Sequence, residues 1–279
     1  MIRRPAVAGQ FYESNPTDLK ERIENCFLHH LGPRKKPNSN QRMNIAGLIS
    51  PHAGYLYSGP IAAHAYYYAS MIEIPELVII LGPNHSGLGS MIATMDKGIW
   101  KTPLGDLRID EDMAKKLIKV SEIIDFSYEA HIQEHSIEVQ LPFLQYVFGS
   151  DFKILPICMG LQDKNTSIEV GDAISKIARF RKTLIVASSD LTHYENQKEA
   201  SFKDLKFINS ILEMNISEMY FILQRLNVSA CGYGPIASLL TSMKHLQVNN
   251  SKLLKYATSG DITGDKNSVV GYSSILFYR

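Results

Sequence analysis

The segment Leu77–His85 reads LVIILGPNH, and it decides the fold class. Its first five residues are all apolar, which is typical of a strand that is buried on both faces of its sheet. Gly82 and Pro83 then end the run, and polar residues follow at once. A strand of this kind needs helices on each side of its sheet, so the segment predicts a layered α/β protein.

Similar apolar runs recur along the chain and alternate with helical patterns. We expect further strands at 44–50, 152–157, 183–188, 252–257 and 269–278. Helical periodicity predicts helices at 60–70, 112–120, 136–148, 168–180 and 199–226. The polar, basic stretch 34–42 is expected to be a surface loop. The whole pattern predicts one domain over residues 1–279, a three-layer α/β/α fold with a mixed, largely parallel central sheet.

Composition and charge exclude several classes of protein. The 279 residues are 45% hydrophobic, which is enough to bury a large core and excludes a disordered chain. The net charge of +1 gives no global field that would draw in nucleic acid or an anionic membrane. Three scattered cysteines argue against a disulfide framework and for a reducing compartment. We therefore expect a cytoplasmic protein without a nucleic-acid or membrane partner.

Polar residues follow three of the predicted strands directly. His52 follows the strand at 44–50, His85 follows the strand that begins at Leu77, and Asp190 and His193 follow the strand at 183–188. In open α/β sheets, ligands bind at the carboxyl ends of the strands, so the three histidines are expected to share a site. Imidazole is the commonest metal ligand, and the pattern therefore predicts a metal or acid/base centre.

Cys231 is a further candidate, because the motif SACGYGP places it just before a helical run. A helix N-terminus favours a thiolate, which suits a metal ligand or a nucleophile. The alternative is a small buried hydrophobic residue, the usual fate of a free cysteine, and the sequence weighs the two about evenly. Cys26 and Cys158 are interpreted as structural.

The string HIQEHSIE supplies a second polar cluster of His131, Glu134 and His135. Its spacing is not that of HExxH, so a zincin does not follow. We expect Glu134 and His135 to cap the helix at 136–148 while they point into the same cleft. The histidines on other predicted helices are given no role: His29, His30, His64 and His245. Phosphate-loop, dinucleotide-binding and nucleophile-elbow motifs do not occur in the sequence.

Six ordered motifs and the opening segment 8–12 together resemble the Memo family across nearly the whole chain. The motifs are PHAGYLYSG (51–59), ILGPNH (80–85), KTPLGDLRID (101–110), EHSIEVQLPF (134–143), SSDLTHY (188–194) and CGYGP (231–235).

The resemblance implies a fold similar to the LigB-like domain of class III extradiol dioxygenases. It further implies metal ligation by His52, His85 and Cys231, with His193 and Asp190 at the acid/base position. Fe(II) is the expected metal, copper the second choice and zinc the third. Prokaryotic members are commonly encoded with an AMMECR1-type protein and a radical SAM enzyme, which implies a functional link to them.

One departure from the dioxygenases bears on the reaction. Their iron is held by two histidines and a carboxylate, whereas the resemblance places Cys231 where the carboxylate would be. Thiolate is softer and more electron-donating, which argues against standard ring cleavage. The first hypothesis is therefore metal-dependent redox chemistry on O₂ or a small molecule, with His193 as a general acid/base that Asp190 positions. The alternatives are a zinc-dependent hydrolase with the same ligands, and a non-enzymatic module that binds a partner or peptide in the same cleft.

Overall fold

Four parallel strands form the centre of the computed structural model, which describes residues 1–37 and 42–279. They are β2 (Ile45–Ser50), β3 (Leu77–Pro83), β8 (Lys153–Met159) and β9 (Thr183–Ser188). Their spatial order is β8-β3-β9-β2, and all the pairings between them are parallel. Strands expected from their apolar runs therefore occupy the middle of the sheet, as predicted.

Further strands, some parallel and some antiparallel to their neighbours, extend this centre on both sides. On one side β12 (Val269–Tyr278) pairs with β2, and with both β10 (His193–Glu195) and β11 (Asn250–Thr258). On the other side are β6 (Gly105–Ile109), β5 (Ile99–Thr102) and β1 (Ile2–Arg3). Two short strands, β4 (Ile92–Thr94) and β7 (Asp125–Phe126), branch from β8. The sheet is therefore mixed with a parallel core.

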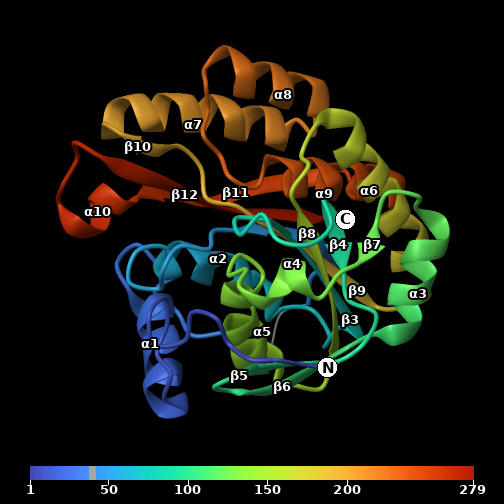
Figure 1. Ribbon diagram of the computed structural model, residues 1–279. Helices are drawn as coiled ribbons and strands as arrows, with labels where there is room; N and C mark the ends of the chain where they lie inside the picture. Colours follow the sequence, from blue (N-terminus) through green and yellow to red (C-terminus); the bar gives the residue numbers. More distant parts are fainter. Residues whose placement is uncertain (38–41) are drawn as a thin grey trace.

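Helices cover both faces of the sheet (Figure 1). One face carries α1 (Pro16–Leu28), α2 (Gly59–Ala69) and α5 (Leu141–Phe148), of which α2 contacts β2 and β12. The other face carries α3 (Glu111–Val120), α6 (Lys164–Ile177) and α9 (Tyr233–His245), and α9 lies against β2, β3 and β9. Next to them, α7 (Gln197–Leu212) extends over β11 and β12, and α8 (Ile216–Arg225) packs on α7. The predicted α/β/α layering is confirmed.

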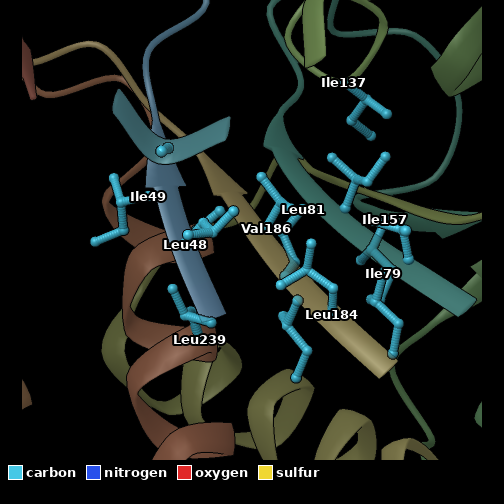
Figure 2. Close-up of a cluster of buried hydrophobic side chains, with 14 of the residues drawn as sticks. Leu48, Ile49, Ile79, Leu81, Ile137, Ile157, Leu184, Val186 and Leu239 are labelled. Carbon is cyan, nitrogen blue, oxygen red and sulfur yellow. The ribbon is translucent and has the colours of Figure 1, made fainter. Parts of the chain in front are cut away.

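The core lies between these layers. Figure 2 shows side chains of β2, β3, β8 and β9 packed together with Leu239 of α9 and with Ile137. Leu48, Leu81 and Leu184 are all completely buried. Burying one such side chain contributes about 1.5–3 kcal/mol, so the apolar runs stabilise the sheet that positions the loops at its edge.

Three helical predictions need correction or completion. The expected helix at 199–226 is two helices, because Met214 has a positive φ of 52° and the Asn215 side chain caps α8 by accepting the Glu218 N–H. The helix expected at 136–148 begins with a 3-10 turn, Glu138–Gln140, before α5. Short helices also occur at α4 (Glu129–Ile132), Ala178–Phe180 and α10 (Ser259–Thr263). Of the expected loop at 34–42, residues 38–41 lie outside the described residues.

Candidate metal centre

Loops at one edge of the sheet bring the candidate residues together. His52, His85 and Asp190 each lie two residues beyond the end of β2, β3 and β9 respectively. Because β9 lies between β3 and β2, their carboxyl ends are neighbours. Cys231 lies in the loop just before α9, and it reaches this edge because α9 packs on these strands.

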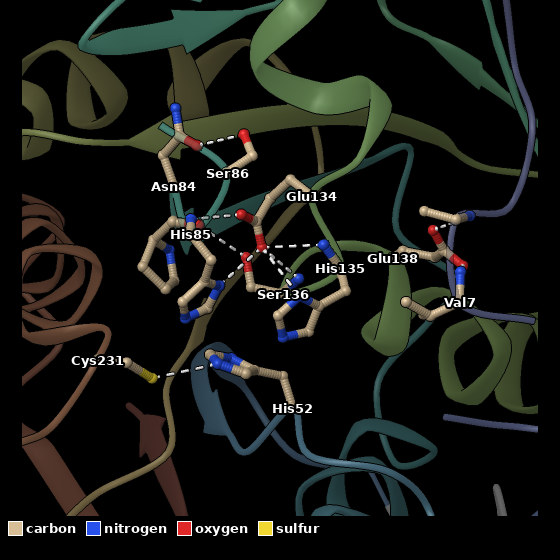
Figure 3. Close-up of polar contacts among 12 residues, drawn as sticks. Val7, His52, Asn84, His85, Ser86, Glu134, His135, Ser136, Glu138 and Cys231 are labelled. Atoms are coloured by element: carbon tan, nitrogen blue, oxygen red, sulfur yellow. Dashed lines mark hydrogen bonds and ion pairs between the residues drawn. The ribbon is translucent and has the colours of Figure 1, made fainter. Parts of the chain in front are cut away.

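Cys231 reaches this edge because glycine follows it. A Cβ at Gly232 would lie only 2.3 Å from the carbonyl oxygen of Ser188, so a larger residue there would push the loop away from β9. The Cys231 Sγ lies 3.1 Å from His52 Nε2 (Figure 3). One donor atom each of His52, His85 and Cys231 lies within 4.8 Å of the others. The three residues expected to ligate metal therefore converge.

The second nitrogen of His85 is held by a buried carboxylate. Glu134 Oε1 lies 3.0 Å from His85 Nδ1, and Oε2 accepts the His85 backbone N–H at 2.6 Å. Burial by itself would raise the pKa of Glu134, but the hydrogen bond and charge of His85 and the Ser136 N–H hold it far below its usual range. An ionised carboxylate only accepts, so His85 donates from Nδ1, and Nε2 is the nitrogen left to face a ligand.

His52 is buried and held at both its backbone and its ring. Its N–H donates to Asp190 Oδ1 at 2.8 Å, and its Nδ1 lies 2.8 Å from Ser188 Oγ. Burial, and next the neighbouring His85, lower the pKa of His52 well below its usual value. The ring is therefore neutral at pH 7, which is the form that binds a metal.

The expectation that the helix favours a Cys231 thiolate is wrong for the protein as it stands. Burial, and then the charge of Asp190, raise the pKa of the Cys231 thiol far above its ordinary value. A helix N-terminus carries a charge of only about +0.5, which does not offset the desolvation of a buried anion. The thiol is therefore protonated at neutral pH and faces the bare nitrogen of His52.

His193 and Asp190 lie at the same edge but not in the expected relationship. His193 donates its backbone N–H to Ser229 Oγ at 2.8 Å, and its Nδ1 lies 2.9 Å from the Ser229 carbonyl oxygen. Among the described residues no hydrogen bond joins Asp190 to His193, and His193 belongs to neither convergent donor group. The predicted positioning of His193 by Asp190 is corrected: Ser229 orients the ring, and Asp190 holds the backbone of His52.

His135 is a site residue that the predicted ligand set lacks. Its ring stacks on His85 with centroids 4.6 Å apart and lies 5.5 Å from the His52 ring. Together with His85 and Glu134 it forms a second convergent group of donors. Phe11 packs against it at 4.9 Å. Glu134 and His135 thus both face His85, but the expectation that they cap a helix is wrong, because neither the 3-10 turn Glu138–Gln140 nor α5 has a side-chain cap.

The opening residues of the chain also support the site, which the sequence did not indicate. Glu138 is fully buried and accepts from the backbone N–H of Ala6 at 2.8 Å and from Tyr12 Oη at 2.5 Å. It also forms a buried ion pair with Arg3, whose guanidinium lies over the Trp100 ring. One carboxylate thus ties the N-terminal segment to the turn that carries Glu134.

The residues interpreted as structural lie away from the centre. Cys26 is buried on α1 and Cys158 is buried within β8, where burial raises the pKa of each thiol. His64 bonds the Leu31 carbonyl, and His245 pairs with Asp172. His29 and His30 lie just beyond the end of α1 rather than on it.

The donor set fits a transition metal. His52 presents Nε2 toward the Cys231 thiol with His85 beside it, and the Nδ1 atom of each ring is occupied by a protein partner, as is usual for ligating histidines. Imidazole and thiolate suit iron, copper and zinc rather than magnesium or calcium. His85 is exposed while His52 is buried, so one side of the centre is open to a small molecule.

The chain resembles known proteins in sequence and in fold. Residues 3–276 match the family model described as Memo-like protein. A MEMO1 family protein of Methanocaldococcus jannaschii is 52% identical over 99% of this chain and 98% of its own. Another, from Methanopyrus kandleri, is 48% identical over the full length of both chains. The crystal structure of an uncharacterized Escherichia coli K12 protein matches with a TM-score of 0.56 at 12% identity. The match covers 84% of this chain and 99% of that protein, and it shows the fold alone.

In the described part of the chain, no helix is both long and apolar enough to cross a membrane.

Proposed function

The chain belongs to the Memo family, and we propose that it binds a redox-active transition metal through His52, His85 and Cys231. Fe(II) is the first choice and copper the second, and the substrate is O₂ or a small oxidisable molecule. The single observation that supports this most is the approach of the Cys231 thiol to His52 Nε2, with His85 completing the donor set.

Each residue at this centre has a distinct role in the proposed function. His52 presents Nε2 to the thiol, and Glu134 keeps the His85 ring in place beside it. A bound metal would supply the one-electron chemistry that these side chains lack. His135 is the ring beside the open side of the centre, and it is the group best placed to contact a substrate there. His193 remains a candidate for proton transfer from the neighbouring loop.

Two alternatives use the same residues differently. A zinc-dependent hydrolase would keep the three ligands and use the metal to acidify a water molecule. A non-enzymatic module would use the cleft to bind a partner or peptide. The identity of the bound metal separates the redox function from the zinc hydrolase. Lack of any metal affinity would favour the binding module.

Elemental analysis of protein purified without oxygen tests the proposal. We expect near-stoichiometric iron or copper in the unaltered chain and none in the triple variant His52→Ala, His85→Ala, Cys231→Ser. His245→Ala is the matched control, because this exposed histidine lies at the far end of the helix that follows Cys231. Stoichiometric zinc would favour the hydrolase. No metal after loading with Fe(II) or Cu(I) would contradict the proposal.

Metal affinity is expected to rise with pH. The thiol is protonated in the metal-free protein, since burial raises the pKa of Cys231, and a metal binds the thiolate. Binding therefore releases about one proton, and the dissociation constant should fall about tenfold for each pH unit between pH 6 and 8. Competition titrations across that range, with buffer-dependent calorimetry to count protons, measure this. A pH-independent affinity would show that Cys231 does not ligate.

The remaining expectations concern location and partners. A cytoplasmic location and a functional link to AMMECR1-type and radical SAM proteins follow from the sequence and the resemblance alone, and they stay predictions. Co-purification of the chain with an AMMECR1-type protein from its own cells would test the link.

A further inference from the structure

The segment Glu134–Gln140 has an unusual pattern of burial. Its alternate residues, Glu134, Ser136, Glu138 and Gln140, are all polar, and each is at most 1% exposed. Buried polar groups are retained where every one finds a partner. Each of these four bonds to a different part of the protein, so the segment connects loops that are far apart in the sequence.

Two of these contacts meet at the hydroxyl of Ser188, the last residue of β9. Ser188 Oγ donates to the Ser136 carbonyl oxygen at 2.7 Å, and Gln140 Nε2 donates to Ser188 Oγ at 2.7 Å. A carbonyl oxygen only accepts, so the single hydroxyl proton of Ser188 is committed to Ser136. The hydroxyl can then act only as an acceptor toward its third neighbour, His52 Nδ1, at 2.8 Å.

The orientation of the Gln140 amide follows from the same reasoning. Its Nε2 lies 3.0 Å from the carbonyl oxygen of Pro51, which requires a donor at that position. Its Oε1 accepts from Tyr66 Oη at 2.5 Å. A flipped amide would set two oxygens against each other at Pro51, so Gln140 presents N–H to Ser188.

We propose that Ser188 is a positioning residue that holds His52 with its proton on Nδ1 and a bare Nε2, and that the Ser136 carbonyl fixes the Ser188 hydroxyl in this role. The Gln140 amide and the Ser136 carbonyl leave Ser188 only one role toward the ring. The bare Nε2 then faces Cys231 Sγ at 3.1 Å.

The same segment also orients the ring of His85. Glu134 fixes His85 by accepting from its Nδ1, so one short segment orients both rings toward the thiol. A close approach makes this possible, because a Cβ at Gly82 would lie 2.3 Å from Ser136 Oγ. The value of this arrangement for metal binding rests on the proposed function, whereas the tautomer of His52 does not.

The experiment measures the His52 ring nitrogens in metal-free protein. Long-range ¹H–¹⁵N correlation spectra of histidine-labelled protein distinguish an N–H nitrogen from a bare one, and His52→Ala identifies the signals. We expect N–H at Nδ1 in the unaltered chain. Ser188→Ala removes the acceptor behind Nδ1, so Nε2–H should become populated. Gln140→Met keeps the size of the side chain and removes only the donor to Ser188, so the Nδ1–H form should persist while Ser136 holds the hydroxyl proton. Ser238→Ala is the control. It removes a buried serine hydroxyl of α9 that donates to the Ser167 carbonyl oxygen of α6 and does not contact His52.

Metal titration of the same variants is the second readout. Loss of a partner behind a ligating histidine typically lowers affinity about 10- to 100-fold, so Ser188→Ala should fall in this range. Ser188→Thr keeps the hydroxyl and should retain the Nδ1–H form. Nε2–H in the unaltered chain, or an unchanged tautomer in Ser188→Ala, would overturn the proposal. If the Nδ1–H form is found but no metal binds, the proposed function fails and the positioning role stands.

Discussion

Replacing Cys231 with serine is expected to lower the affinity for Fe(II) or Cu(I) by more than about 100-fold, because losing a partner behind a ligand already costs up to that much. A serine hydroxyl is a far weaker acid than a thiol, and its oxygen is a harder ligand than sulfur. It therefore does not replace the thiolate at neutral pH. The variant should remain folded, since serine is close to cysteine in size. Competition titration with a chelator of known affinity measures the change.

The controls separate ligand loss from damage to the fold. Cys26→Ala removes a buried thiol on α1 and should bind metal as the unaltered chain does. His85→Ala should lose metal as Cys231→Ser does, because its Nε2 belongs to the same donor group. Thermal unfolding followed by circular dichroism checks that each variant is folded. Full metal content in both Cys231→Ser and His85→Ala would rule out the proposed ligands.

Replacing Glu138 with alanine is expected to lower the free energy of unfolding by about 3–5 kcal/mol, the usual cost of breaking a buried ion pair. The change leaves Arg3, which is 1% exposed, without its carboxylate. It also removes the acceptor for the N–H groups of Ala6 and Val7 and for Tyr12 Oη. Urea denaturation monitored by fluorescence measures the loss.

An exposed ion pair provides the contrast for this prediction. Lys182 pairs with Glu73 at the surface, so Glu73→Ala should leave the free energy of unfolding almost unchanged. In the double variant Arg3→Met, Glu138→Leu, no buried charge is left unpaired, and stability should recover in part relative to Glu138→Ala. A Glu138→Ala protein as stable as Glu73→Ala would contradict the importance assigned to this carboxylate.

The candidate site could be predicted in part from the sequence. Strand ends identified His52 and His85, because the carboxyl ends of neighbouring parallel strands meet at one edge of a sheet. The place of Cys231 before a helix leaves its role an even choice, and the resemblance to a known family adds it to the ligands. The string HIQEHSIE places His135 near the site, but nothing in it says which ring stacks on His85.

By itself, the sequence determined the α/β class, the central strands and the loops that carry the candidate ligands. These depend on local patterns: apolar runs fix which segments are buried on both faces, and glycine and proline fix where they end. The resemblance carried by six motifs determined the family, which the comparisons confirm.

Only the tertiary structure decided how the side chains around the centre are partnered. Ser229 rather than Asp190 orients His193, and Ser188 and Gln140 constrain His52 from β9 and the turn before α5. The protonated state of Cys231 also depends on burial by distant segments rather than on the helix that follows it. Hydrogen-bond partners and desolvation depend on distances across the fold, and no pattern of neighbouring residues encodes them.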